Sequence, residues 1–110
     1  MKEAGLFATF AAKVVELVHF NRKISTEKVL SELDQMGFRP AELCELRAFG
    51  AKYPKVRREF PVIALGSVWQ DSNGYRRCAC LRKLGSGRRL SLRWVDFDWN
   101  DFCRFAAVRK

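Results

Sequence analysis

Histidine, cysteine and long apolar runs are scarce in this chain of 110 residues, and each scarcity excludes a class of protein. The only histidine is His19, so paired catalytic histidines and metal sites built on several histidines are excluded. No apolar run reaches the roughly 18 residues of a membrane-spanning helix, so we expect no membrane span. Four cysteines are too few for a small secreted domain held together by disulfides.

The N-terminal apolar stretch predicts a helix of the mature protein. Lys13 and Glu16 interrupt this stretch, which runs over residues 6–20, and no small-residue cleavage site follows it. We therefore expect a cytoplasmic protein with reduced cysteines.

Five residue types become rare after residue 70. Gln, Lys, Glu, Met and Trp occupy 18 of positions 1–70 but only three of positions 71–109, and no glutamate follows Glu59. These five types share one property, since none of them is encoded by a codon that ends in a pyrimidine. The C-terminal segment is built instead from Asp, Ser, Asn, Gly, Tyr, Arg, Cys, Ala, Leu, Phe and Val.

The net positive charge of the chain arises entirely in its second half. Residues 1–50 hold seven basic and seven acidic residues, whereas residues 51–110 hold 14 basic and five acidic ones and so carry the whole net charge of +9. This excess favours either simple solubility or a partner with negative charge.

Periodicity in the first half predicts three helices, over 5–20, 26–36 and 40–51. Ser25 is suited to cap the second helix at its N-terminus, and Gly37 to end it in a left-handed conformation. Pro40 is expected to open the third helix. The candidate core residues of the three helices are Phe7, Phe10, Ala11, Val14, Leu17, Val18, Val29, Leu30, Leu33, Met36, Leu43, Leu46, Ala48 and Phe49.

The second half predicts strands over 62–69, 75–81, 88–95 and 102–108. Asn73-Gly74 is typical of a two-residue hairpin turn. Along 88–95, Leu90, Leu92 and Trp94 alternate with polar residues, which predicts that these three face the core. The chain is thus predicted to be a single α+β domain over 1–110, with a helical part (1–54) packed on a small, mostly antiparallel sheet (55–110).

Residue types suited to catalysis or metal binding are few. Cys78 and Cys80 form one close pair without a nearby histidine, which is too little for a zinc site. Asp96, Asp98 and Asp101 could hold a cation or exchange protons, although such a cluster is more often a solvated turn. No nucleophile with a neighbouring base can be assembled, so we expect no enzyme, no metal and no cofactor.

Arginine and aromatic residues dominate the C-terminal half and indicate a binding surface. From Arg57 onward there are ten arginines and two lysines. Arginine offers a planar fork of donors and stacks on aromatic rings, and Arg, Trp and Tyr dominate binding hot spots. Such a surface would suit a protein or another macromolecule, or single-stranded nucleic acid as the alternative partner.

Two motifs resemble those of C-type-lectin-like and formylglycine-generating-enzyme-like domains. Gly37-Phe38-Arg39-Pro40, with Glu45 and Leu46 following, resembles their "G-x-R-x-P … E" helix start, and residues 104–109 resemble their closing strand. Together with the composition break, this is similar to the variable proteins of diversity-generating retroelements. In those proteins adenine mutation turns AAY codons into NNY codons, which encode every residue except the five rare types.

The resemblance implies a rigid scaffold that carries exchangeable contact residues. The scaffold would be Trp94, Leu90, Leu92, Phe105 and Val108. The implied ligand-binding residues, including the aromatic Trp99, are Asp71, Ser72, Asn73, Tyr75, Arg77, Arg93, Asp96, Phe97, Asp98, Trp99, Asn100, Asp101 and Phe102.

Overall fold

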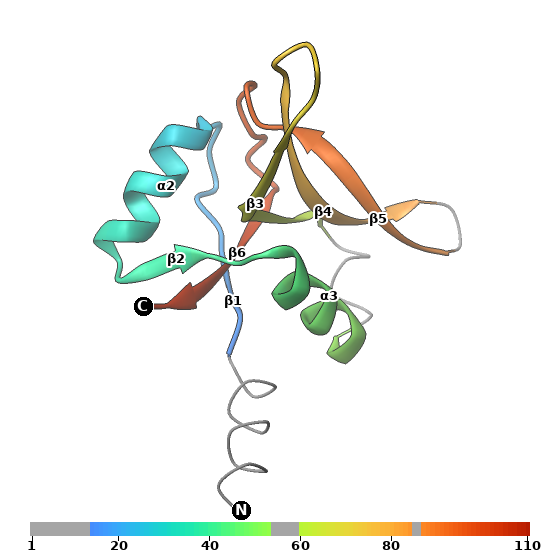
Figure 1. Cartoon of the computed structure of the whole chain (residues 1–110). Helices are drawn as coiled ribbons and strands as arrows, with labels where there is room; N and C mark the ends of the chain where they lie inside the picture. The colour runs from blue at the N-terminus through green and yellow to red at the C-terminus, as the bar shows by residue number, and fades with distance from the viewer. Residues whose placement is uncertain (1–13, 54–59, 85–86) are drawn as a thin grey trace, which may run out of the picture.

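The computed structural model of the protein describes residues 14–53, 60–84 and 87–110. Within them lie two helices and six strands that form one sheet (Figure 1). The elements in chain order are β1 (Glu16–Val18), α2 (Thr26–Gln35), β2 (Phe38–Pro40), α3 (Leu43–Lys52), β3 (Val62–Gln70), β4 (Arg76–Leu84), β5 (Gly87–Trp94) and β6 (Arg104–Arg109). The predicted α+β class is confirmed.

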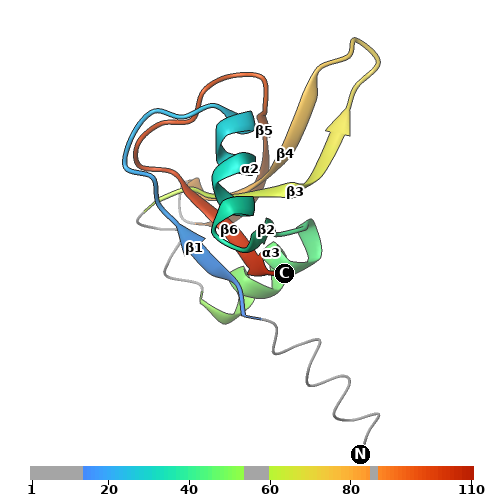
Figure 2. The same cartoon turned by 90° about the vertical axis from the view of Figure 1, so that its left-hand side faces the viewer.

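The sheet has the strand order β1-β6-β3-β4-β5, and β2 also pairs with β6. Every pairing is antiparallel except that of β3 with β6, so the expectation of a mostly antiparallel sheet is confirmed. The first and last strands described, β1 and β6, lie side by side (Figure 2).

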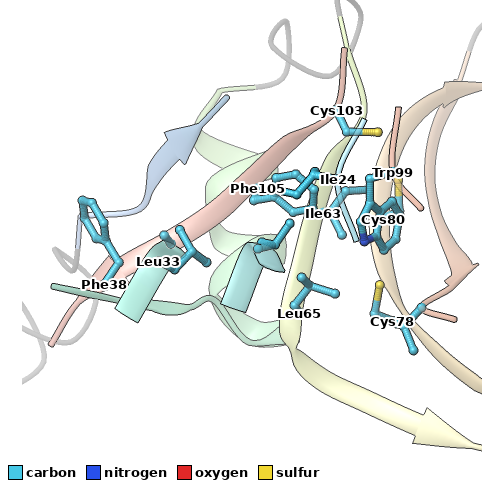
Figure 3. Packing of buried hydrophobic residues seen from close by; sticks show 13 residues of the cluster. Ile24, Leu33, Phe38, Ile63, Leu65, Cys78, Cys80, Trp99, Cys103 and Phe105 are labelled. Atoms are coloured by element: carbon cyan, nitrogen blue, oxygen red, sulfur yellow. The ribbon is translucent and has the colours of Figure 1, made fainter. Parts of the chain in front are cut away.

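The helices cover opposite faces of the sheet and create two apolar clusters. Neighbouring residues of β6 alternate between them: Phe105 and Ala107 pack toward α2, whereas Ala106 and Val108 pack toward α3. Val29 and Leu33 of α2 are fully buried in the first cluster, in which Figure 3 labels Leu33, and Leu46 of α3 is fully buried in the second. Three layers result, with the sheet in the middle.

Local sequence signals placed α2 correctly. The Ser25 side chain accepts a hydrogen bond from the Lys28 backbone N–H at 3.2 Å, which caps the helix as predicted. Gly37 has φ +83°, the left-handed conformation expected after the helix. Leu30 and Met36, expected in the core, are exposed.

The predicted N-terminal helix is wrong where the structure describes it. Residues 16–18 form strand β1, and residues 5–13 lie outside the described residues. Val15 and Leu17 are half-buried against the cluster beside α3. Val18 and Phe20 are half-buried against the cluster beside α2, and Val14 is exposed. A strand covered on both faces is apolar throughout, and such a run imitates a helix.

The third helix begins later than predicted. Pro40 belongs to β2, and α3 starts at Leu43, so strands β1 and β2 lie within the part expected to be helical. The Leu43 backbone N–H donates to Ser67 Oγ of β3 at 3.0 Å, which satisfies one of the free donors at the start of the helix. Of the core residues expected in α3, Leu46 is buried, Leu43 and Phe49 are half-buried, and Ala48 is exposed.

The strand predictions hold for position better than for burial. Strand β3 confirms its prediction, β4 runs on to Leu84, and β6 starts at Arg104 instead of residue 102. On β5, however, Leu90, Leu92 and Trp94 are 45, 50 and 38% exposed, so the prediction that they form buried scaffold is wrong. Helix α3 packs on β3 and β4, and β5 lies beyond it at the edge of the sheet. The other two predicted scaffold residues, Phe105 and Val108, are buried.

A candidate ligand-binding surface

The β3–β4 hairpin ends in a loop that Asp71 holds together. Its Oδ1 accepts hydrogen bonds from the backbone N–H groups of Asn73 (2.9 Å) and Tyr75 (3.0 Å), and its own N–H donates to the Tyr75 carbonyl. Gly74 has φ +87° and donates to the Asp71 carbonyl, so the loop is a turn followed by a left-handed glycine. This geometry replaces the two-residue turn predicted from Asn73-Gly74.

Three exposed aromatic side chains meet beside this loop. Tyr75 and Trp94 have ring centroids 4.9 Å apart, and Trp94 and Phe97 6.2 Å apart, both in edge-on geometry. Tyr75 is 49%, Trp94 38% and Phe97 67% exposed. We call these three residues the aromatic surface. Tyr75 comes from the hairpin loop, whereas Trp94 ends β5 and Phe97 follows it.

Two ion pairs lie beside the aromatic surface. Arg77 lies with its guanidinium carbon 4.7 Å from the Trp94 ring centroid and its Nη2 3.6 Å from Asp71 Oδ2. Arg76 donates to Asp96 Oδ1 through Nη2 at 2.7 Å and Nε at 3.1 Å. These contacts join the hairpin to β5 and to the segment after it.

The Arg76–Asp96 pair also sets the charge state of this region. Hydrogen bonds from Arg76 lower the pKa of Asp96, and the same contact raises the pKa of Arg76. The two groups are therefore both charged at neutral pH. Because they are exposed, the pair contributes orientation more than stability.

Trp99 is buried, so its predicted place in the binding surface is wrong. It is 2% exposed, its indole N–H donates to Thr26 Oγ1 at 2.9 Å, and its ring meets the edge of Phe105. Its backbone pairs with Ile24 through N–H···O bonds of 2.8 and 3.1 Å. Trp99 belongs to the core, beside Ile24 in Figure 3.

The remaining predicted contact residues divide around Trp99. Ser72 and Asn73 are exposed in the hairpin loop, and Asp98 is exposed one residue after Phe97. Asn100, Asp101 and Phe102 are also exposed but follow Trp99, and His19 Nε2 donates to the Asp101 carbonyl, which places this stretch beside the segment after β1.

Arg93 faces away from the aromatic surface. It is half-buried, with its guanidinium carbon 5.9 Å from the ring centroid of the core residue Trp99. Neighbouring residues of a strand point to opposite faces, so Arg93 lies on the α2 side while Trp94 lies on the other.

Three of the four cysteines are core residues (Figure 3). Cys78, Cys80 and Cys103 are buried beside α2, whereas Cys44 is exposed. Burial raises the pKa of Cys78 to about 12 and that of Cys80 to about 11. Both thiols stay protonated at neutral pH, which makes them poor nucleophiles. Among the described residues, no three His, Cys, Asp or Glu side chains are grouped so that they could hold a metal ion.

Comparison with protein-family models, curated proteins and solved structures gives no match. In the part of the chain that the structure describes, no helix has the length and apolar character to cross a membrane.

Proposed function

We propose that this protein is a non-enzymatic ligand-binding domain and that the aromatic surface is the centre of its binding site. One observation carries the proposal: Tyr75, Trp94 and Phe97 gather from two segments, in mutual contact, and remain exposed. Contiguous apolar groups on the outside of a small domain mark interaction sites.

The chemistry around the aromatic surface suits a protein or another macromolecule. Tyrosine and tryptophan offer large, rigid contact areas at low entropic cost, and short polar side chains offer adaptable hydrogen bonds. Here Ser72, Asn73 and Asp98 supply the polar groups beside the rings. The ion pairs of Arg76 and Arg77 preorganise the site, which lowers the cost of binding.

A C-type-lectin-like fold is supported by the way in which the two motifs meet. Arg39 donates to both carboxylate oxygens of Glu45, at 2.9 and 2.7 Å, so the charged residues of the first motif bind each other. Strand β2, which holds Arg39, pairs with β6, which holds the closing motif. The motifs are thus parts of one structural unit.

Diversification of the surface by a retroelement is supported by its composition. Tyr75 and Phe97 can be encoded by NNY codons, whereas Trp94 between them cannot. Under this proposal Trp94 is a fixed anchor, and its neighbours in the aromatic surface are exchangeable. The genomic test is a nearby near-copy of the segment that encodes 71–109, with adenines where this gene differs, beside a reverse transcriptase. Only synonymous drift in that segment among close relatives would contradict diversification.

Alanine variants test the binding site directly. Phe97→Ala is expected to weaken binding of an isolated partner by about 2 kcal/mol, roughly 30-fold, because it removes an exposed anchor. Phe102→Ala is the matched control, since it removes an exposed phenyl ring on the far side of Trp99 and should change affinity less than twofold. Titration calorimetry measures both. Equal affinities of wild type and Phe97→Ala would show that the site lies elsewhere.

Nucleic acid is the second candidate partner, favoured by the charge of +9 in residues 51–110. Within the proposed site, however, Arg76 and Arg77 already face Asp96 and Asp71. A gel-shift series with single-stranded DNA separates the two candidates. Nucleic-acid binding requires a shift that disappears steeply with added salt, and no shift at low salt would exclude it.

A further inference from the structure

Strand β5 forms an open edge of the sheet. It pairs with β4 along its whole length, from Arg77↔Trp94 to Leu84↔Gly87, and it stands last in the strand order. Among the described residues no strand pairs with its other side, which is the outer rim of the sheet in Figure 1. An edge of this kind can accept a further strand.

The backbone groups at this edge face outward at alternate residues. The Val95 N–H donates to the Arg76 carbonyl at 3.1 Å, one step beyond the Arg77↔Trp94 pair. In an antiparallel ladder hydrogen-bonded and non-bonded pairs alternate. The N–H and C=O groups of Leu90, Leu92 and Trp94 therefore point away from β4, and those of Ser91 and Arg93 point toward it.

The same three residues form an apolar row on one face of the edge. Leu90 and Leu92 are about half exposed, and their neighbours on β4, Leu81 and Ala79, are buried. Helix α3 covers the β4 residues, since a Cβ added to Gly50 would lie 2.6 Å from Leu81 Cδ1. The row is thus the uncovered margin of an apolar layer, and one added strand would continue that layer.

The charge of the β4–β5 hairpin selects the occupant. Residues 76–94 contain six arginines, one lysine and no acidic residue. Arg76 and Arg77 face Asp96 and Asp71, so the remaining four arginines and Lys83 supply the positive charge of the hairpin. A second copy of this chain would bring the same arginine-rich strand against itself, and like charges opposite each other in a sheet are unfavourable. Nucleic acid would match the charge, but it offers no strand backbone for alternating N–H and C=O groups, and leucines give no stacking platform.

We propose that β5 binds an extended, acidic peptide segment of a partner protein as an added antiparallel or parallel strand. Backbone hydrogen bonds to Leu90, Leu92 and Trp94 would hold the segment. Its apolar side chains would cover the exposed leucine row, and its acidic side chains would meet the surrounding arginines. Trp94 belongs both to this site and to the aromatic surface, whereas Tyr75 and Phe97 lie outside β5.

A peptide in which glutamate alternates with valine is the probe, and its lysine counterpart is the control. The full chain should bind the acidic peptide, with slowed amide exchange at Leu90 and Leu92 and unchanged exchange at Ser91. Leu92→Pro removes a backbone N–H that points away from β4, and an edge strand tolerates proline at such a position. Leu92→Ala keeps this N–H and removes only the side chain. We expect the proline variant to bind about tenfold more weakly than the alanine variant, measured by fluorescence anisotropy.

Equal binding of the acidic and lysine peptides would overturn this proposal, and so would equal affinities of the folded Leu92→Pro and Leu92→Ala variants. Edge amides that are protected from exchange without any peptide would also overturn it. Concentration-dependent dimerisation that protects the same amides would identify a second copy as the occupant. Binding of an oligothymidylate that displaces the peptide, with Leu92→Pro unaffected, would identify nucleic acid instead. Phe97→Ala keeps every backbone group of β5, so it should leave peptide binding unchanged, and failure of this proposal can be told from failure of the aromatic surface.

Discussion

Thr26 occupies the middle of a buried hydrogen-bond chain, and its replacement is a sharp test of the core. The Trp99 indole N–H donates to Thr26 Oγ1 at 2.9 Å, and the Thr26 hydroxyl donates to the Val95 carbonyl at 2.6 Å. Thr26 is 5% and Trp99 2% exposed, so water cannot take over either bond. Thr26→Val keeps the shape of the side chain and removes both bonds.

The expected loss of stability follows from the two groups left without partners. A buried donor or acceptor without a partner costs about 1–3 kcal/mol, so the two groups together should lower the free energy of unfolding of Thr26→Val by roughly 2–6 kcal/mol. That is a large part of the ~5–15 kcal/mol of a typical domain. Thr26→Ser keeps the hydroxyl and should lose only about 1 kcal/mol with its methyl group.

Urea unfolding followed by far-ultraviolet circular dichroism measures both variants. A valine variant within about 0.5 kcal/mol of the serine variant would refute the reasoning. Trp99→Phe supplies a second check, because it removes the indole N–H. In that background Thr26→Val leaves only the Val95 carbonyl without a partner, so its cost should fall by about 1–3 kcal/mol. Strictly additive losses would show that Thr26 and Trp99 are not coupled.

Two further predictions concern the cysteines and Gly66 of β3, which lies where the pairing of β3 with β4 shifts register between Ala64 and Val68. Gly66→Ala should lower the free energy of unfolding by about 1–3 kcal/mol, because the new Cβ would lie 2.6 Å from the Ala41 carbonyl oxygen. Urea unfolding measures this loss, and a value below about 0.5 kcal/mol would contradict the close approach. At about pH 8 a thiol reagent should label Cys44 alone in the folded protein, since burial keeps the thiols of Cys78 and Cys80 protonated. Mass spectrometry measures the labelling, and labelling of these two cysteines as fast as Cys44 would contradict their burial.

Elements defined by local signals were predictable from the sequence. Helix α2 carries a capping serine at one end and a left-handed glycine at the other, and both act within a few residues of the helix. Strand β3 is a β-branched apolar run between a proline and a turn. In each case the signal lies inside the element, so no knowledge of the tertiary packing was needed.

Elements defined by their neighbours were not predictable in the same way. Strand β1 reads as a helix because the sheet is covered on both sides by α2 and α3, so its side chains are apolar on both faces. The alternation on β5 was read correctly, but the burial of each face depends on how far α3 reaches across the sheet. The sequence around Gly66 does not indicate that a glycine is needed there. The need arises because the backbone of Ala41, 25 positions earlier, lies too close to Gly66 for a Cβ to fit.

The aromatic segment after β5 shows the same limit at the functional site. Composition indicates that residues 96–102 are too aromatic for a solvated loop, but it cannot say which ring turns inward. Trp99 turns inward because of residues that lie more than 70 positions earlier in the chain. Thr26 accepts a hydrogen bond from the Trp99 indole N–H, and the backbone of Ile24 pairs with the backbone of Trp99. Burial of Trp99 leaves Phe97 with the hairpin and Phe102 with the segment after β1. The predicted binding surface is therefore divided into two parts by Trp99. In the part beside the hairpin, the aromatic rings contact one another and an ion pair joins the two segments.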